Sequence, residues 1–282
     1  MKHQSIFSML LAAFLLLSCS PTKSELILDH RYVYSGVSLD ISGETSNARA
    51  STWHPDGTMI YVTGRSTENV VSYSVEFPWE LNRASLKSSY DLSVELTSGS
   101  VAHGLFIRDD GQKMWVFNRT EMWGYELESP WDVASATGGY RVDFSEHVQR
   151  GHDVDFSEDG TRLFIDDRSA RAVHQYKLGE AWDITTANWV YSLDISAHER
   201  QVRGIEIVKD GSVMLLLDTS RRELQQYNLS EPYDVSTATF HSRFDLSRQT
   251  TDPRGLSISR DLTRFYITGR DRGRIYQYVR VE

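Results

Sequence analysis

Short runs of apolar residues alternate with turn residues along most of the chain. In residues 104–107, 113–117, 122–127 and 140–144, aliphatic and aromatic side chains are concentrated, and glycine, proline and acidic residues separate these runs. Apolar runs of this length, bounded by turn signals, are typical of β-strands, whereas an amphipathic helix shows a longer period of about 3.6 residues. The pattern therefore predicts four short strands in this part of the chain.

The same four-strand pattern recurs five times. An aspartate marks each repeat, at intervals of 49 to 54 residues, and the five are Asp56, Asp110, Asp159, Asp210 and Asp261. A glycine follows the first four, whereas Leu262 follows the fifth. Asp-Gly between apolar runs is a strong hairpin signal, because glycine readily adopts the positive φ of a tight turn. Four strands per repeat at this period predict the radial blades of a β-propeller.

Aromatic residues also recur at fixed places in the repeats. A tyrosine lies in every predicted third strand, and an aromatic turn follows in the first four repeats, at Trp79, Trp131, Trp182 and Tyr233. Tryptophans of this kind are able to stack on sugars, but a fixed place in every repeat favours packing within the blades.

The two ends of the chain predict how the ring closes. The fifth repeat stops just after its third strand, and residues 32–41 (YVYSGVSLDI) are similar to the fourth strand at residues 189–195 (WVYSLDI). A ring in which the N-terminal strand completes the C-terminal blade has no exposed sheet edge at the junction. We therefore predict an all-β fold over residues 30–282: a five-bladed β-propeller with four-stranded blades, closed by the N-terminal strand.

The first 29 residues are predicted to lie outside this fold. Lys2 precedes an apolar run at residues 6–17, which suits a signal-peptide core and is too short to cross a membrane. Residues 16–19 (LLSC) resemble a bacterial lipobox, and Cys19 is the single cysteine of the chain. The resemblance implies a signal peptide at residues 1–18, a lipidated Cys19 and a tether over residues 19–29. Ser20, which is not acidic, then directs the lipoprotein to the outer membrane of the bacterial cell envelope.

The repeats resemble those of bacterial β-propeller repeat lipoproteins in which an Asp-Gly turn leads into a Tyr-Val strand. Residues 56–64 (DGTMIYVTG) carry this match most clearly, and residues 261–269 (DLTRFYITG) are similar. The resemblance covers nearly all of the chain after the signal peptide. It implies a scaffold, so an activity has to be sought in the side chains that the repeats bring together.

Composition narrows the classes of partner. The formal net charge of -9 argues against a nucleic-acid partner, since such a protein needs clustered cations to neutralise phosphates. After Cys19 no apolar stretch has the about 20 residues that cross a bilayer, so membrane contact is expected through the lipid alone. No phosphate-loop, dinucleotide-binding or zinc-helix motif is present, and no cofactor or metal is expected.

Cations recur at the start of every predicted first strand, despite the acidic net charge. The register of the repeats places Arg49, His103, His152, Arg203 and Arg254 there. The first strand of a blade is innermost, so these side chains are expected around one mouth of the central channel. The loop between strands two and three shares that face, and in four repeats it begins with Arg65, Arg119, Arg168 and Arg270. Converging guanidinium groups suit carboxylate, phosphate or sulfate, which predicts a site for an anionic small molecule, glycan or protein segment.

Other interpretations of the charged residues remain open. The ring cations can hold loops together by pairing with Asp166, Asp167 and Asp218, and the two histidines are then structural rather than metal ligands. A further set of acids, Asp153, Asp155 and Glu206, lies in first strands and can face the channel, where two carboxyl groups are able to cleave a glycosidic bond. No recognisable motif joins these acids, and ion pairs with the arginine ring or solvated channel walls are the favoured interpretation.

Together these observations favour a binding propeller displayed on the cell envelope over an enzyme. One alternative is an envelope glycan hydrolase or lyase that uses the channel carboxylates. Another is a structural component of an assembly, in which the cations stabilise blades and the outer edges meet partner proteins.

Overall fold

The computed structural model describes residues 28, 30–45, 47–64, 69–93, 102–208 and 210–281. Cys19, Ser20 and Arg65 lie outside these residues, as do the predicted signal peptide and most of the tether. Among the residues that are described, no helix has the length and apolar character needed to cross a membrane.

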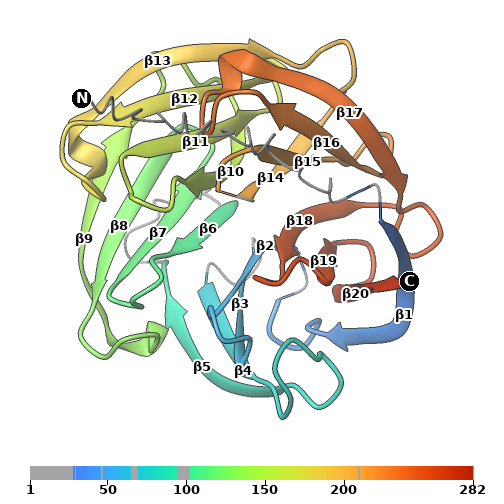
Figure 1. Ribbon diagram of the computed structural model, residues 1–282. Helices are drawn as coiled ribbons and strands as arrows, with labels where there is room; N and C mark the ends of the chain where they lie inside the picture. The colour runs from blue at the N-terminus through green and yellow to red at the C-terminus, as the bar shows by residue number, and fades with distance from the viewer. Residues whose placement is uncertain are drawn as a thin grey trace, which may run out of the picture.

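Twenty strands in the described part of the chain form five antiparallel sheets of four strands, arranged as blades around one axis (Figure 1). The first blade contains β2 (Ala48–Trp53), β3 (Met59–Gly64), β4 (Asn69–Ser74) and β5 (Ser85–Asp91), and the second contains β6 (Gly104–Ile107), β7 (Lys113–Asn118), β8 (Glu121–Leu127) and β9 (Ala136–Asp143). The third contains β10 (Gly151–Phe156), β11 (Arg162–Asp167), β12 (Ala172–Leu178) and β13 (Ala187–Asp194), and the fourth contains β14 (Val202–Val208), β15 (Val213–Asp218), β16 (Glu223–Leu229) and β17 (Ala238–Asp245). The five-bladed propeller predicted from the repeats is confirmed.

The fifth blade joins the two ends of the chain. It contains β18 (Pro253–Ile258), β19 (Arg264–Gly269), β20 (Arg274–Val281) and, as its outermost strand, β1 (Arg31–Asp40). β1 pairs antiparallel with β20, with Tyr34 opposite Tyr278, and Figure 1 shows β1 lying beside β20 and the C-terminal end of the chain. The predicted closure by the N-terminal strand agrees with this sheet.

The fourth strand of the second blade begins earlier than predicted, at Ala136. A single turn of 3-10 helix, Val133–Ser135, leads directly into it, and the Asp132 carboxylate caps that turn by accepting the backbone N–H of Ala134. The third and fourth blades repeat this turn at Ile184–Thr186 and Val235–Thr237.

Aromatic turn residues cover the hairpin glycines in four blades. The backbone N–H of Trp182 donates to the Gly160 carbonyl at 2.9 Å, and a Cβ on Gly160 would overlap the Trp182 indole. Gly160 also has a φ of +69°, which a residue with a side chain adopts only at a cost. In the fifth blade the fourth strand comes from the N-terminus and brings no such turn. There Leu262 replaces the glycine, and the Tyr32 hydroxyl donates to its carbonyl at 2.6 Å.

The hydrophobic core lies between neighbouring blades. Tyr61 of the first blade packs with Met114 and Val116 of the second, and all three are fully buried. The Tyr61 hydroxyl donates to the Trp131 carbonyl at 2.9 Å, which links the same two blades by a hydrogen bond. Packing between blades holds five separate sheets in a fixed arrangement, so the positions of side chains around the central axis are well determined.

We expect Gly160→Ala to destabilise the fold by about 2 to 4 kcal/mol, because it adds an overlap with Trp182 to the backbone cost of positive φ. The matched control is Gly138→Ala, since Gly138 has the same φ of +69° but nothing within 4 Å of an added Cβ. Gly138→Ala should lower the free energy of unfolding by only about 1 kcal/mol. Equilibrium urea unfolding measures the free energy of unfolding of both variants. Equal losses would show that the packing of Trp182 on Gly160 contributes nothing to stability.

Candidate functional site

The five residues predicted at the first strands gather at one mouth of the channel. Arg49, His152, Arg203 and Arg254 lie at the starts of β2, β10, β14 and β18, and His103 directly precedes β6. All five are buried, with exposed fractions between 3% and 8%. We call these residues, together with the rim arginines described below, the basic mouth.

The two histidines of the basic mouth contact each other. Their rings meet edge to face with centroids 4.5 Å apart. Burial lowers the pKa of His103 to about 2, assisted by the positive charges of Arg49 and Arg203, and the pKa of His152 falls below its usual range for similar reasons. Both imidazoles are therefore neutral at physiological pH.

Several polar atoms of this mouth have no partner within the described ranges. Neither ring nitrogen of His103 makes a hydrogen bond, nor does Nε2 of His152. The Nδ1 atom of His152 lies 3.1 Å from the Arg150 carbonyl, which occupies the other nitrogen of that ring. Buried polar atoms are nearly always paired in folded proteins, so these nitrogens call for a partner other than the described residues, such as a water molecule or a ligand.

Arg203 is the most unusual cation of the basic mouth. Its side chain makes no ion pair with any described residue, and its buried Nε has no hydrogen-bond partner. Burial lowers its pKa to about 8, and the charges of Arg254, Arg168 and Arg49 act in the same direction. The charge of Asp252 acts in the opposite direction but is too weak to restore the usual pKa, so burial of this guanidinium costs folding free energy.

The rim of the basic mouth adds further arginines. Arg119 and Arg150 are exposed, and Arg168 and Arg270 are partly buried. One carboxylate, Asp252, pairs with both Arg254 (2.6 Å) and Arg270 (2.5 Å). The structure therefore brings the predicted ring and rim residues together, apart from Arg65, which lies outside the described residues. Their role in binding stays a prediction.

Two residues of this mouth were not predicted from the sequence. Arg150 and Asp252 occupy the same position of the repeat, two residues before the ring residue, but carry opposite charges. The ring residues could be predicted because a cation or a histidine recurs at their position in every repeat. The position of Arg150 and Asp252 lacks this pattern, because its charge changes between blades.

Asp166, Asp167 and Asp218 have a different role from the pairing with ring cations considered above. Asp166 accepts the backbone N–H groups of His152 (2.6 Å) and Asp153 (3.0 Å). Asp167 and Asp218 likewise accept several backbone N–H groups of the adjoining loops. The ion pairs of the two loop aspartates involve His174 and Arg221, which are not ring residues. These carboxylates fix loops, and none of the three forms a salt bridge with Arg203.

The channel carboxylates Asp153 and Asp155 connect the third blade to the fourth. Asp155 accepts the backbone N–H of Ile207 at 2.6 Å, and Asp153 accepts that of Ile205 at 3.4 Å. With Glu206 they line a cavity of about 40 Å³, which has room for about one water molecule but not for a sugar ring. The geometry therefore favours a structural role for Asp153 and Asp155 over glycoside cleavage, although Glu206 also borders a larger cavity of about 220 Å³.

Burial favours the protonated forms of these acids. It raises the pKa of Asp155 to about 7, and it raises the pKa values of Asp153 and Glu206 well above the usual range, with a further contribution from neighbouring carboxyl groups. In the described part of the chain, no group of three His, Cys, Asp or Glu residues is arranged to hold a metal ion.

Comparison with known proteins supports the fold alone. No protein-family model and no curated protein matches the sequence. A solved structure of a Lactobacillus plantarum protein has a TM-score of 0.51 at 12% identity, over 83% of this chain and 67% of that one. The Cps50 (Swd1) β-propeller domain of Myceliophteria thermophila (TM-score 0.48, 8% identity, 83% of both chains) is also similar. So is the periplasmic gluconolactonase PpgL of Pseudomonas aeruginosa (TM-score 0.47, 14% identity, 82% of this chain). This chain spans 66% of the length of the gluconolactonase.

We expect Glu206→Gln to reduce the dependence of stability on pH. The Glu206 pKa is higher in the folded than in the unfolded chain, so the unfolded chain loses its proton first as pH rises, and folding stability falls from about pH 4.5 upward until the folded pKa is reached. The melting temperature of the unmodified protein should therefore drop relative to that of the variant between pH 5 and pH 8. Glu146→Gln, at a side chain with 86% exposure, is the control and should leave the profile unchanged. Parallel profiles for all three proteins would contradict this account of Glu206.

Proposed function

We propose that this protein is an anion-binding β-propeller of the bacterial cell envelope, with its ligand at the basic mouth. The observation that carries the proposal is Arg203, a buried guanidinium with no ion pair among the described residues and with other arginines around it. A ligand carboxylate, phosphate or sulfate at this point would supply the direct ion pair that Arg203 does not make with any described residue. It would also accept hydrogen bonds from the planar guanidinium, two at a time where the geometry allows.

The histidines extend the chemistry of the proposed site. A neutral imidazole carries one N–H donor and one acceptor nitrogen, so it recognises a hydroxyl as well as an anionic oxygen. His103 and His152 lie side by side with unpaired nitrogens next to the arginines. This combination suits a ligand that carries hydroxyl groups beside its negative charge, such as an acidic sugar or a hydroxy acid. The repulsion stored in the mouth would then be relieved when the ligand binds.

We also propose that Cys19 is lipidated and anchors the propeller in the outer membrane. The support is the LLSC sequence at residues 16–19 after an apolar run, and Ser20 at the next position. About 0.8 kcal/mol for each buried methylene group makes more than one acyl chain a stable anchor. A tethered propeller would meet its ligand at the membrane surface.

Arg203→Met should stabilise the ligand-free fold and weaken binding. Replacing an unpaired buried cation by an apolar side chain of similar length is expected to add about 1 kcal/mol or more of stability. Loss of a charge-assisted contact should lower affinity at least about tenfold. Thermal unfolding, and titration calorimetry with inorganic phosphate, citrate and glucuronate at low and high salt, measure the two effects.

Arg31→Met, at an exposed arginine of β1, is the control for Arg203→Met and should change neither property. The proposal predicts that at least one of the three anions binds saturably and more weakly at high salt. If none binds, or if Arg203→Met binds as well as the unmodified protein, the basic mouth is not an anion site.

For the anchor, Cys19→Ser should abolish incorporation of a palmitate analogue in a diderm bacterial host and move the protein from the membrane to the soluble fraction. The matched variant Ser20→Asp should keep the label but hold the protein in the inner membrane, because the residue after the lipidated cysteine sorts the lipoprotein. Label retained by Cys19→Ser would exclude lipidation at this residue.

A further inference from the structure

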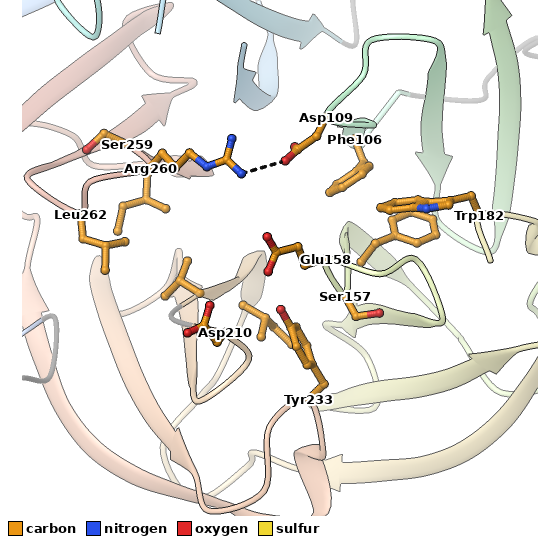
Figure 2. A pocket seen from close by; sticks show the side chains of 14 residues that line it. Phe106, Asp109, Ser157, Glu158, Trp182, Asp210, Tyr233, Ser259, Arg260 and Leu262 are labelled. Atoms are coloured by element: carbon orange, nitrogen blue, oxygen red, sulfur yellow. Dashed lines mark hydrogen bonds and ion pairs between the residues drawn. The ribbon is translucent and has the colours of Figure 1, made fainter. Parts of the chain in front are cut away.

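A second pocket lies at the opposite mouth of the channel, where the hairpin turns connect first and second strands. It has a volume of about 340 Å³, and Figure 2 shows its lining side chains around one opening. Four aromatic rings contribute to its walls: Phe106, Phe156, Trp182 and Tyr233. We call this cavity the turn-side pocket. Its volume falls in the range of small-molecule sites in proteins.

Three carboxylates stand among these rings. Asp109 pairs with Arg260 at 3.4 Å, and both side chains are more than half exposed. Glu158 and Asp210 form no ion pair with any described residue, and Figure 2 shows the Glu158 carboxylate between Tyr233 and the Asp109–Arg260 pair. The carboxylates around the opening therefore outnumber the described cation, which gives the turn-side pocket the sign opposite to the basic mouth.

The aromatic walls are held rigidly. Trp182 is fixed from below by the hairpin glycine, and its ring lies 5.5 Å from Phe156 and 6.0 Å from Phe106, measured between centroids. A tryptophan face attracts cations through its quadrupole, and a wall that is already ordered loses little entropy when a ligand binds. A pocket lined by apolar rings and carboxylates is suited to a ligand that carries a positively charged group on an apolar stem.

An acid without a partner lies deeper on the same side. A cavity of about 220 Å³ adjoins the turn-side pocket and shares Phe106, Asp109 and Arg260 with it. Glu206 lines this cavity, and it makes no hydrogen bond or ion pair with the residues that the structure describes. Glu206, whose pKa is raised by burial, adds a carboxyl group able to form a hydrogen bond there, whereas the negative charge of the site comes from the exposed carboxylates.

A packed layer separates the turn-side pocket from the basic mouth. The first strands approach so closely that a Cβ on Gly255 would overlap the Arg49 carbonyl, and one on Gly104 would lie 3.0 Å from Asp153. The cavity in this layer measures only about 40 Å³. A ligand larger than water cannot span the channel, so the two mouths form independent sites.

We propose that the turn-side pocket binds an organic cation, namely an ammonium group on an alkyl or aromatic stem. The ammonium lies among Glu158, Asp210 and Asp109, and the stem packs on Trp182 and Tyr233. This site does not depend on the anion site proposed above, and each is open to test without the other.

The test is titration calorimetry of the purified protein with phenethylammonium, and with 2-phenylethanol as an uncharged ligand of nearly the same shape. We expect saturable binding of the cation, at least about fivefold tighter than binding of the alcohol, because an exposed ion pair contributes up to about this factor. Glu158→Gln combined with Asp210→Asn should weaken binding of the cation about tenfold and leave the alcohol unaffected. Both positions are exposed, so the double variant should fold normally.

Two controls identify the site. Glu146→Gln removes an exposed carboxylate outside the turn-side pocket, and Arg203→Met alters the basic mouth; neither should change the affinity for phenethylammonium. Trp182→Phe, which retains an aromatic ring over Gly160, should weaken it several-fold, because tryptophan attracts cations best. Absence of saturable binding, equal binding of the alcohol, or unchanged affinity in the Glu158/Asp210 double variant would each overturn the proposal, whatever the outcome for anions at the basic mouth.

Discussion

Closure of the ring by pairing of β1 with β20 is the constraint on which the rest of the structure depends. Once the ring is closed, five first strands must share one axis, and they pack closely there because small residues occupy the narrowest position in four blades. These residues are Ala50, Gly104, Gly204 and Gly255, whereas the equivalent position of the third blade holds Asp153. A side chain at the start of a first strand therefore points toward the side chains at the same position in the other blades. The closed ring therefore brings five arginine and histidine side chains together, although these side chains do not attract one another.

This crowding makes electrostatics the main cost of the channel. Arg203 is buried among other arginines, and the histidines beside it are neutral because burial and then the nearby positive charges lower their pKa values. In the middle of the channel, burial raises the pKa values of Asp155 and Glu206 and so favours their neutral forms. Charged groups that lower stability are typical of sites kept for function, since selection for folding alone would replace them by apolar residues. The channel thus has a basic mouth, a neutral packed layer and an acidic, aromatic mouth.

Repetition and departure from repetition have different roles in this chain. The aromatic turn over a hairpin glycine recurs in four blades because each blade needs the same packing, and the fifth blade dispenses with it where Tyr32 arrives from the N-terminus. The channel-facing position that holds Asp155 and Glu206 holds Thr52, Phe106 and Ser257 in the other blades. That variation gives a symmetric scaffold an asymmetric interior, with carboxyl groups between two blades and an aromatic wall nearby.

The sequence by itself determined the blade count, the strand order, the closure and the convergence of cations on one mouth. Each of these follows from a periodic pattern, and a closed ring converts equal positions in the repeats into neighbours in space. Only the tertiary structure decided three other features. These are the contacts of Asp252 with two arginines, the hydrogen bonds of Asp153 and Asp155 to backbone N–H groups, and the lack of an ion pair between Arg203 and any described residue. The same holds for the turn-side pocket, whose walls come from four blades. Such features depend on which single side chain of one blade reaches the next, at distances of a few ångströms, and a repeat pattern carries no information about contacts that occur once.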